Sequence, residues 1–396
     1  MLRKQAVFDR EAFLALPDLP PRLKLWGEDR ELEDFLTQKA FAIKPLPGSV
    51  PRADGEVKIA VVGSGPAGLG SADELIRLGF KVTVFERDDR PGGLLMYGVP
   101  NIKLPKAIVL QKIEALQAAG VEFRLQTEIG RDVTFAELQK EFAAIIVCVG
   151  STSPRRLKMI NDDARGVYYA KDFLTYVTRA MLQPEAAVPV DAAGKDVVIV
   201  GGGDTGNDCV GTCIRHGCKS VTQLEMMPKA PDTRRESNPW PQWPLVCKTD
   251  YGQEEAIAVF GHDPRIYTTT VKEFKKDKKG NLEKVVVISL ESKVDEKTGR
   301  RMMVPVEGTE KELPCELVLI AAGFLGTQKY VTDAFGVELT ERTNIKTEEG
   351  KFATNAAGVF TAGDCHTGQS LVVKAIRQGR DCAREVDKYL MGYTNL

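Results

Sequence analysis

Two short glycine-rich segments carry the clearest chemistry in this sequence. Each follows an apolar run, at residues 58–62 and 196–200, and each has the spacing G-x-G-x-x-G. In such a turn the first glycine lets the chain leave a strand sharply, the second lets the backbone approach a pyrophosphate, and the third lets a helix pack on the strand. The N–H groups at the start of that helix then face the anion. The glycines are Gly63, Gly65 and Gly68 in the first segment and Gly201, Gly203 and Gly206 in the second.

An acidic residue completes each segment about 20 residues further on, at the end of a second β-branched run. Glu86 and Glu225 stand where a carboxylate can accept hydrogen bonds from ribose hydroxyls. Residues 58–86 and 196–225 are therefore an internal repeat of one β-α-β unit. A single glycine motif would be weak evidence. Its repetition with a strand, a helix, a second strand and an acid predicts two dinucleotide-binding sites.

Further apolar runs must form the sheets that position these turns. Residues 144–149 and 317–322 are continuously apolar and end in Gly150 and Gly323, which is typical of parallel strands buried on both faces. Ligands bind outside the carboxyl ends of such strands, so we expect both glycines to face a dinucleotide. A similar run at 358–363 ends in Asp364, and the last helix begins near Leu371.

The order of these elements predicts an α/β fold with two Rossmann-like dinucleotide-binding domains, one inserted in the other. The expected boundaries are 51–155 and 327–396 for the first domain, 156–326 for the inserted domain, and 1–50 for a Pro-rich N-terminal arm. Within the insert, residues 285–290 are expected to form a strand and the lysine run at 275–280 a solvated hairpin tip.

Two adjacent dinucleotide domains suggest one flavin and one nicotinamide. The pair Gly92-Gly93 after the first repeat can lie under a long, permanently bound cofactor. Asp364 can bond the ribityl chain that only a flavin possesses, and a helix starting at Leu371 would favour the anion of a reduced flavin. The second repeat lacks these additions, as suits a nicotinamide that dissociates. Because hydride passes directly between the cofactors, no catalytic side chain and no metal site are predicted.

Composition excludes some other classes of function. The chain has 396 residues, with 54 Lys and Arg against 55 Asp and Glu, and this balance argues against a nucleic-acid partner held by bulk charge. No stretch approaches the roughly 20 apolar residues that span a bilayer, so no membrane association is expected. Charged residues at 9–11 interrupt any apolar leader, which predicts a cytoplasmic protein.

From residue 58 onward the chain resembles the small (beta) subunit of glutamate synthase, whose electron-input module also occurs in NADPH-ferredoxin transhydrogenase and dihydropyrimidine dehydrogenase. The matching motifs are GSGPAGL (63–69), FERDDRPGGLLMYGVPN (85–101), VVIVGGGDTGNDCVGTCIRHG (197–217), NPWPQWP (238–244), KTDYGQEEA (248–256), AGDCHTGQSLVVKAIRQGRD (362–381) and YLMG (389–392). The resemblance implies a glutathione-reductase-like arrangement with FAD on the first domain and NAD(P)H on the inserted one.

Site residues follow from the repeat, the strand ends and the resemblance together. For FAD we expect Gly63, Gly65, Pro66, Ala67, Gly68, Glu86, Arg87, Gly93, Leu94, Lys103, Gly150, Gly363, Asp364, Ser370 and Leu371. For NAD(P)H we expect Gly201, Gly203, Asp204, Thr205, Gly206, Glu225, Arg234, Arg235 and Gly323. Lys103, Asp204, Arg234 and Arg235 enter these sets through the resemblance.

One departure from the family concerns the electron acceptor. Family members carry an upstream cysteine-rich domain that binds iron–sulfur clusters, whereas this chain has no Cys before Cys148 and its eight Cys lack cluster spacing. The family implies an electron-input subunit that passes electrons from NAD(P)H through FAD to a large glutamate-synthase-like subunit or an iron–sulfur protein. The alternatives are a stand-alone diaphorase with a small acceptor and a flavin-bound interaction protein.

Several residues have competing interpretations. Cys209 and Cys213 share a helix face but favour packing over a metal site, and Cys365 favours a filler role over redox chemistry. Trp240, in a proline-spaced segment, favours a buried brace over a partner-facing surface. At the second site Glu225 favours NADH, because a carboxylate repels a 2′-phosphate. The basic residues Lys229, Arg234 and Arg235 follow closely and could offset that repulsion.

Overall fold

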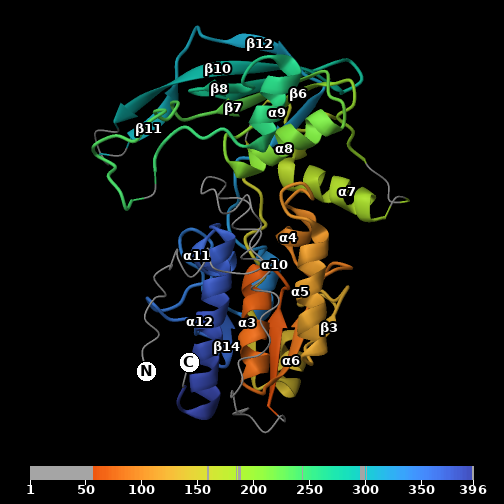
Figure 1. Ribbon diagram of the computed structural model, residues 1–396, viewed down its shortest axis with the longest axis vertical. Coiled ribbons are helices and arrows are strands. Elements are labelled where there is room, and N and C mark those ends of the chain that lie inside the picture. The colour runs from red at the N-terminus through yellow and green to blue at the C-terminus, as the bar shows by residue number, and fades with distance from the viewer. Residues whose placement is uncertain are drawn as a thin grey trace, which may run out of the picture.

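The computed structural model describes residues 57–157, 160–183, 185, 189–242, 244–294, 299 and 301–394. The described chain forms two units stacked along the long axis of the molecule, each built on a parallel sheet (Figure 1). The predicted arm at 1–50 and Trp243 lie outside the described residues.

The first unit contains a parallel sheet with the order β14-β4-β1-β2-β3. Its strands are β1 (Lys58–Val62), β2 (Lys81–Phe85), β3 (Glu122–Arg124), β4 (Ala144–Val147) and β14 (Val359–Thr361). The direction of strand succession reverses at β1, because β2 and β3 lie on one side of it and β4 and β14 on the other. A crevice at such a reversal, outside the carboxyl ends of the strands, is where open α/β sheets bind ligands.

Helices cover both faces of this sheet. Ile59 and Val61 of β1 face one hydrophobic core and Ala60 and Val62 face the other, as the alternation of side chains along a strand requires. The first face packs on α3 (Pro66–Arg77), α5 (Lys106–Ala118) and α12 (Val372–Met391). The second face packs on α6 (Phe135–Glu141) and α10 (Lys329–Phe335). Two short helices, α4 (Leu94–Tyr97) and α11 (Asp364–Thr367), lie at the carboxyl ends of the strands.

The second unit repeats this plan with the strand order β5-β13-β6-β7-β8. The strands are β5 (Val167–Tyr169), β6 (Asp196–Val200), β7 (Ser220–Glu225), β8 (Arg265–Tyr267) and β13 (Leu317–Ile320). One face packs on α7 (Ala170–Leu182), α8 (Asp204–Arg215) and α9 (Tyr251–Phe260). The predicted α/β fold with paired Rossmann-like sheets is thereby confirmed.

An antiparallel sheet covers the other face of the second unit. It comprises β9 (Thr269–Lys276), β10 (Leu282–Val294), β11 (Arg301–Pro305) and β12 (Lys311–Pro314), with β9, β11 and β12 all paired to β10. Phe274 and Val285 of this sheet pack against Val198 and Val318 of the parallel sheet. The expected strand at 285–290 is part of β10, and the turn between β9 and β10 is solvent-exposed.

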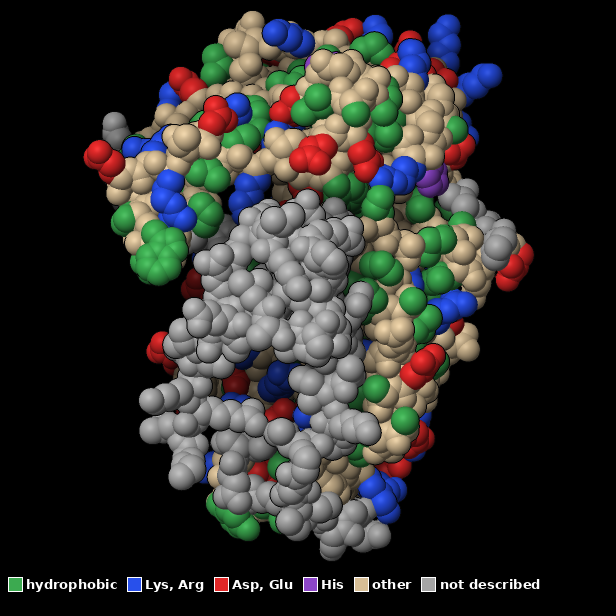
Figure 2. Space-filling view, viewed as in Figure 1, with side chains coloured by type: hydrophobic (Ala, Val, Ile, Leu, Met, Phe, Trp, Pro, Cys, Tyr) green, Lys and Arg blue, Asp and Glu red, His purple; other side chains and the backbone are tan. Residues whose placement is uncertain are grey.

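The surface and the helices give two further findings. Lys, Arg, Asp and Glu side chains are interspersed on the face shown in Figure 2, in keeping with a net charge of −1. None of the helices in the described ranges is long and apolar enough to cross a membrane. The domain boundaries at 155 and 326 stay proposals; the strands of the two parallel sheets fall on either side of them.

Candidate functional site

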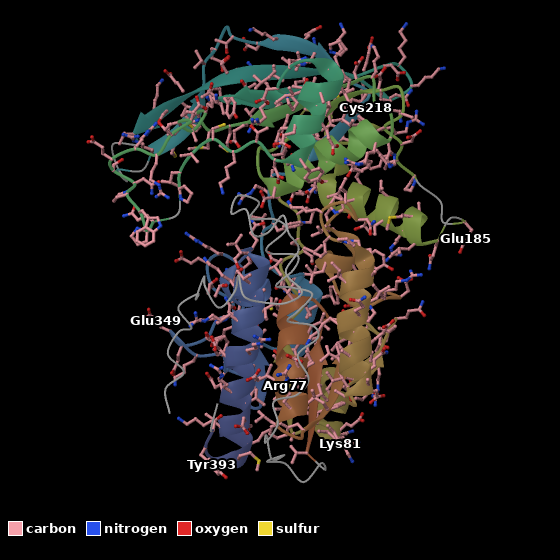
Figure 3. The ribbon with its side chains drawn as sticks, viewed as in Figure 1. Arg77, Lys81, Glu185, Cys218, Glu349 and Tyr393 are labelled. Carbon is pink, nitrogen blue, oxygen red and sulfur yellow. The ribbon has the colours of Figure 1, made fainter. Side chains whose placement is uncertain are left out.

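The first glycine turn joins β1 to α3 at the end of the first unit that faces the second unit. Figure 3 labels Arg77, the last residue of α3, low in the first unit and away from the second unit, so the start of α3 lies nearer the boundary. A Cβ on Gly63 would lie 2.5 Å from the Cys148 carbonyl oxygen, and one on Gly68 would lie 1.9 Å from the Gly63 carbonyl oxygen. These two glycines permit close backbone packing.

Gly65 differs from its neighbours in the same turn. It is the N-cap of α3, its φ of −66° suits any residue, and a Cβ there would meet no atom of the described residues within 4 Å. Gly65 also lines the cavity described below. The N–H groups of the first turn of α3 have no side-chain cap, which leaves them available to an anion.

Glu86 is tied to this turn by hydrogen bonds. Its carboxylate accepts from the Ser64 N–H at 3.2 Å, from the Ser64 hydroxyl, and from the Asp88 N–H at 2.9 Å. The residue is 6% exposed, and burial raises the pKa of its carboxyl group, while the Ser64 hydrogen bond works in the opposite direction. The structure thus fixes the acid of the first repeat beside the glycine turn.

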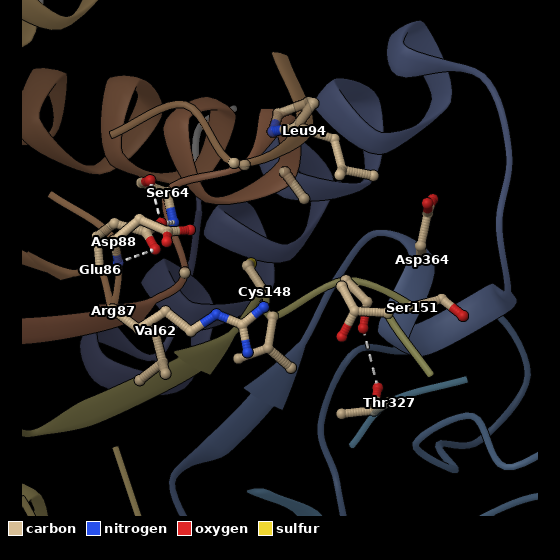
Figure 4. A pocket seen from close by; sticks show the side chains of 18 of the residues that line it. Val62, Ser64, Glu86, Arg87, Asp88, Leu94, Cys148, Ser151, Thr327 and Asp364 are labelled. Carbon is tan, nitrogen blue, oxygen red and sulfur yellow. Dashed lines mark hydrogen bonds between the residues drawn. The ribbon is translucent and has the colours of Figure 1, made fainter. Parts of the chain in front are cut away.

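A cavity of about 440 Å³ opens at this turn. Figure 4 shows Glu86 and Ser64 on one side of it and Asp364 and Ser151 on the other. Eleven of the residues expected to bind FAD line the cavity: Gly63, Gly65, Pro66, Ala67, Glu86, Arg87, Gly93, Leu94, Gly150, Asp364 and Ser370. A volume of this size is within the range of small-molecule and cofactor sites.

The other four expected residues lie behind or beside the cavity wall. Gly68 and Gly363 allow tight packing, since a Cβ on Gly363 would come within 2.7 Å of the Ala67 Cβ. Leu371 is the N-cap of α12 and is 54% exposed, while its neighbours Ser370 and Val372 line the cavity. The Lys103 Nζ lies 3.2 Å from the Asp208 carboxylate on α8, so this side chain links the two units.

Asp364 supplies a carboxyl group at the far side of the cavity. Burial raises its pKa to about 6, and a hydrogen bond from the Ser370 backbone works in the opposite direction. Asp364 begins α11, directly after the strand β14, so its place follows from the parallel sheet that the sequence predicts.

The second glycine turn, between β6 and α8, repeats the geometry of the first. A Cβ on Gly201 would lie 2.4 Å from the Ala321 carbonyl oxygen, and one on Gly206 would lie 2.2 Å from the Gly201 carbonyl oxygen. Gly203 is the N-cap of α8 and again has open space beside it. Asp204 and Thr205 form the exposed first turn of α8.

Glu225 stands at the second turn as Glu86 stands at the first. Its carboxylate accepts a hydrogen bond from the Met227 N–H at 2.7 Å, and a Cβ on Gly202 would lie 1.8 Å from one of its oxygens. Residue 202 is glycine where the first turn has Ser64, and this leaves room for the Glu225 side chain.

The three basic residues that follow Glu225 in the sequence have different surroundings. The Lys229 Nζ lies 3.1 Å from the Asp232 carboxylate, and Arg234 donates to the carbonyl oxygens of Asn238 and Gln242 at 3.1 and 2.8 Å. Arg235 is exposed. Lys229 and Arg234 thus already have partners on their own loop.

The strand-end glycines lie toward the boundary between the units. Gly150 has a φ of +70°, and its carbonyl oxygen accepts a hydrogen bond from the Thr327 hydroxyl at 3.1 Å. Gly323 has a φ of +82°, and the Gln369 side chain lies within 2.8 Å of the position a Cβ would take. Gln369 comes from the first unit, so the two units meet at Gly323.

The structure places both the cysteines of α8 and Trp240. Cys209 and Cys213 are fully buried in the core between α8 and its sheet, where they act as small apolar side chains. The expectation of a buried brace is wrong for Trp240, which is 82% exposed. Trp240 lies in a turn of the segment that connects β7 to α9.

Sequence reasoning missed a group of cavity residues on α7. Lys171, Thr175 and Arg179 line the cavity although α7 packs on the sheet of the second unit. Their spacing of four residues was a readable signal that they share a helix face, but nothing in the local sequence shows that this face meets the first unit.

Comparisons with known proteins agree with this geometry. Residues 57–379 match the pyridine nucleotide-disulphide oxidoreductase family. The glutamate synthase [NADPH] small chain of Bacillus subtilis is 45% identical over 92% of this chain and 74% of its own length. The glutamate synthase [NADH] of Schizosaccharomyces pombe is 43% identical over 88% of this chain, which spans only 17% of that protein.

The fold is also similar to that of a solved structure. Mycobacterium tuberculosis FprA in complex with NADPH superposes with a TM-score of 0.66 at 19% identity, covering 85% of each chain. The chain therefore belongs to the pyridine nucleotide-disulphide oxidoreductases and, among them, to the glutamate synthase small-chain family. It is an NAD(P)H-dependent flavoprotein oxidoreductase that uses FAD, as the sequence predicts.

The residues present fit FAD on their own geometry. The described residues leave open space beside Gly65 at the N-terminus of α3, and the Glu86 carboxylate is fixed beside this turn. Asp364 and Ser370 line the same cavity. A helix N-terminus for a pyrophosphate and carboxylates for hydroxyl groups are the features that a dinucleotide such as FAD requires.

Proposed function

We propose that this chain is the electron-input subunit of a glutamate-synthase-like system. The observation that carries the proposal is the pairing of the cavity at the first glycine turn with a second, geometrically equivalent turn in the same chain. The small chain of B. subtilis named above supports the assignment to glutamate synthase. FAD supplies the capacity to accept a hydride and to release electrons singly.

The chain's own groups hold and orient the cofactors in this proposal. Gly65 and the start of α3 receive the pyrophosphate of FAD, Glu86 receives the ribose, and Asp364 with Ser370 receives the ribityl chain. Positioning supplies most of the rate, because holding two reactants together replaces a bimolecular encounter. The remaining residues expected to bind FAD surround these contacts. For Lys103, the contact with Asp208 supports a role in joining the two units.

The second turn, at Gly203, receives the pyrophosphate of NAD(P)H in this proposal. Asp204 and Thr205 then flank the pyrophosphate, and Glu225 receives the ribose of the adenosine. We further propose a preference for NADH. Glu225 repels a 2′-phosphate, and the contacts of Lys229 with Asp232 and of Arg234 with two loop carbonyl oxygens hold these basic side chains on their own loop.

The electron acceptor is proposed to be a large glutamate-synthase-like subunit or an iron–sulfur protein. The relatives support the first of these two acceptors, because both are named as glutamate synthases or as a chain of one. Purification of the tagged chain from its own source tests the proposal. A stoichiometric large subunit, and glutamate formed from glutamine and 2-oxoglutarate by that complex, would support it. Rapid NADH-driven reduction of a quinone with no accelerating protein partner would favour a stand-alone diaphorase.

The third possibility, a flavin-bound interaction protein, makes a different prediction. In that case neither NADH nor NADPH would bleach the flavin absorbance when rapidly mixed with the chain. The cytoplasmic location that the sequence predicts stays a prediction.

A further inference from the structure

Helix α7 closes the cavity from the side of the second unit. Phe173 and Leu174 anchor α7 in the core of the second sheet. Lys171, Thr175 and Arg179 follow one another at intervals of four and line the cavity together. Helix α7 therefore packs on the second unit with one face and forms part of the cavity wall with another face.

The charged residues on the cavity wall indicate what this face of α7 can bind. The described lining residues include four carboxylates, Glu86, Asp88, Glu128 and Asp364, and three cations, Arg87, Lys171 and Arg179. The Arg87 guanidinium donates to the Gln328 side chain at 2.9 Å and lies 3.9 Å from the Glu128 carboxylate. Lys171 and Arg179 are the two cations that α7 brings to the cavity wall, and each keeps N–H donors beyond its ion pair that a doubly charged pyrophosphate can accept. They add to the N–H groups and the helix dipole that the glycine turn offers to such an anion.

Arg179 is held at the cavity wall by contacts with two residues of the first unit. One terminal nitrogen donates to the Asp88 carboxylate at 2.6 Å, and the guanidinium carbon lies 4.9 Å from the centre of the Tyr97 ring. Its Nε is buried and has no hydrogen-bond partner among the described residues. A guanidinium carries five N–H donors in a fixed plane, so donors remain for a ligand while Asp88 and Tyr97 fix that plane.

Lys171 stands two turns before Arg179 on the same face. Its Nζ lies 3.0 Å from the carboxylate of the adjacent residue Asp172, and its side chain is 25% exposed. This pair leaves further N–H donors of the ammonium group free to bond another acceptor.

We propose that Lys171 and Arg179 bind the pyrophosphate of FAD, so that the second unit supplies part of the flavin site. This inference rests on the proposed function, because it takes the cavity to be the FAD site. Bound FAD then joins the two units, and its retention depends on how α7 packs against the first unit.

The test uses the full-length chain loaded with FAD. FAD release after dilution is followed by the gain in flavin fluorescence, and ADP and adenosine are compared as competitors for rebinding. Arg179→Met is expected to weaken FAD and ADP about tenfold, the size of one charge-assisted hydrogen bond, and to leave adenosine unchanged. Lys171→Met is expected to act in the same direction. The matched control is Arg377→Met on α12, whose side chain is 82% exposed and which should leave all three affinities unchanged.

A purely structural role for Arg179 predicts a different pattern. If Arg179 only joins the units through Asp88, then Asp88→Asn will loosen FAD as much as Arg179→Met does, and the inference is overturned. If Arg179 serves the anion, Asp88→Asn frees its guanidinium and FAD binds equally well or more tightly. Equal losses for ADP and adenosine, or no loss in either cation variant, also overturn it.

Two results separate the inference from the proposed function. A wild-type chain that binds no FAD contradicts the proposed function, whereas a yellow wild type with unaffected variants contradicts only the role of α7. If Arg179→Met does not fold, Arg179→Lys replaces it. That variant keeps the charge but loses the planar fork, and it should weaken ADP by a smaller factor while sparing adenosine.

Discussion

At the scale of single residues, the glycines of each turn divide into two kinds. Gly63 and Gly68 face backbone carbonyl oxygens, so a side chain there would disrupt the protein interior. Gly65 and Gly203 face open space and have negative φ values, so a side chain there costs the fold little and fills only the space of a ligand. Substitutions at the second kind of glycine therefore report on binding with little effect on folding.

Gly65→Val is expected to weaken FAD binding at least about a hundredfold, or about 3 kcal/mol, because the side chain occupies the pyrophosphate space. Gly203→Val should leave the protein yellow but not reducible by NAD(P)H. Absorbance spectra of the two purified variants, with thermal unfolding as the check on folding, measure both effects. A yellow Gly65→Val variant with normal FAD affinity would contradict the assignment of the first turn.

Asp364 should make stability depend on pH. Because burial raises the pKa of its carboxyl to about 6, the folded chain holds this proton to a higher pH than the unfolded chain does. The unfolded state therefore binds fewer protons between roughly pH 4 and pH 6, and this group's contribution to stability falls as the pH rises through that window. Asp364→Asn removes the ionisation.

We expect FAD-free Asp364→Asn to be more stable than the wild type above pH 6 by about 1 kcal/mol, less than the full shift because the carboxyl keeps contact with solvent. Near pH 4 the difference should disappear. Denaturant unfolding at both pH values measures this. A constant difference across the range would mean that Asp364 acts through packing or hydrogen bonding and not through its charge.

Glu225 tests coenzyme choice. Glu225→Ala should weaken NADH by about 1 to 2 kcal/mol through the lost hydrogen bonds to ribose, while NADPH should lose less, because the variant no longer repels its 2′-phosphate. The ratio of the two kcat/KM values for flavin reduction measures the change. Equal losses for both coenzymes would remove the argument for an NADH preference.

At the scale of elements, the packing of α12 on α3 fixes the position of the first glycine turn. A Cβ on Gly379 of α12 would lie 2.1 Å from the Ala67 carbonyl oxygen, in the first turn of α3. Gly70 of α3 similarly approaches the Ile376 backbone of α12. These glycines bring the backbones of the two helices together directly behind the proposed pyrophosphate site.

Gly379→Ala sets two effects against each other. Alanine favours a helix by about 1 kcal/mol over glycine, but overpacking against backbone costs about 1 to 3 kcal/mol. Because a carbonyl oxygen cannot rotate away as a side chain can, we expect net destabilisation together with weaker FAD binding. Arg377→Ala on the exposed face of α12 is the control. Unchanged stability and FAD affinity in Gly379→Ala would show that the helices can separate freely.

At the scale of the whole molecule, the two units are joined through charged side chains as well as through the chain itself. The Lys103 Nζ contacts the Asp208 carboxylate, and Arg179 contacts Asp88. Asp208 also accepts a hydrogen bond from the Tyr251 hydroxyl at 3.1 Å. Burial raises the pKa of its carboxyl group, and the Lys103 charge works in the opposite direction. Through these contacts, α8 of the second glycine turn and α7 of the cavity wall are both joined to the first unit.

The sequence was sufficient for what depends on local pattern. Spacing and periodicity predict the two glycine turns, their acidic residues and the buried parallel strands. The turns and the acidic residues lie where strands of the two parallel sheets end. The face of α7 could not be predicted, because Lys171 and Arg179 gain a role only when the second unit is packed against the first. The contact of Lys103 with Asp208, 105 positions further along the chain, depends on the same packing. The burial of Trp240 was predicted wrongly, because proline spacing indicates an extended segment but does not show whether that segment packs on a domain; its side chain is exposed.

We infer that this one chain holds FAD and NAD(P)H so that hydride passes between them. Anaerobic titration of the purified full-length chain with NADH and with NADPH, followed by the flavin absorbance band, tests it most directly. We expect a yellow protein whose flavin band is bleached by one equivalent of reduced coenzyme, more readily by NADH. A protein that carries no flavin after incubation with FAD, or a yellow protein that neither coenzyme bleaches, would contradict it.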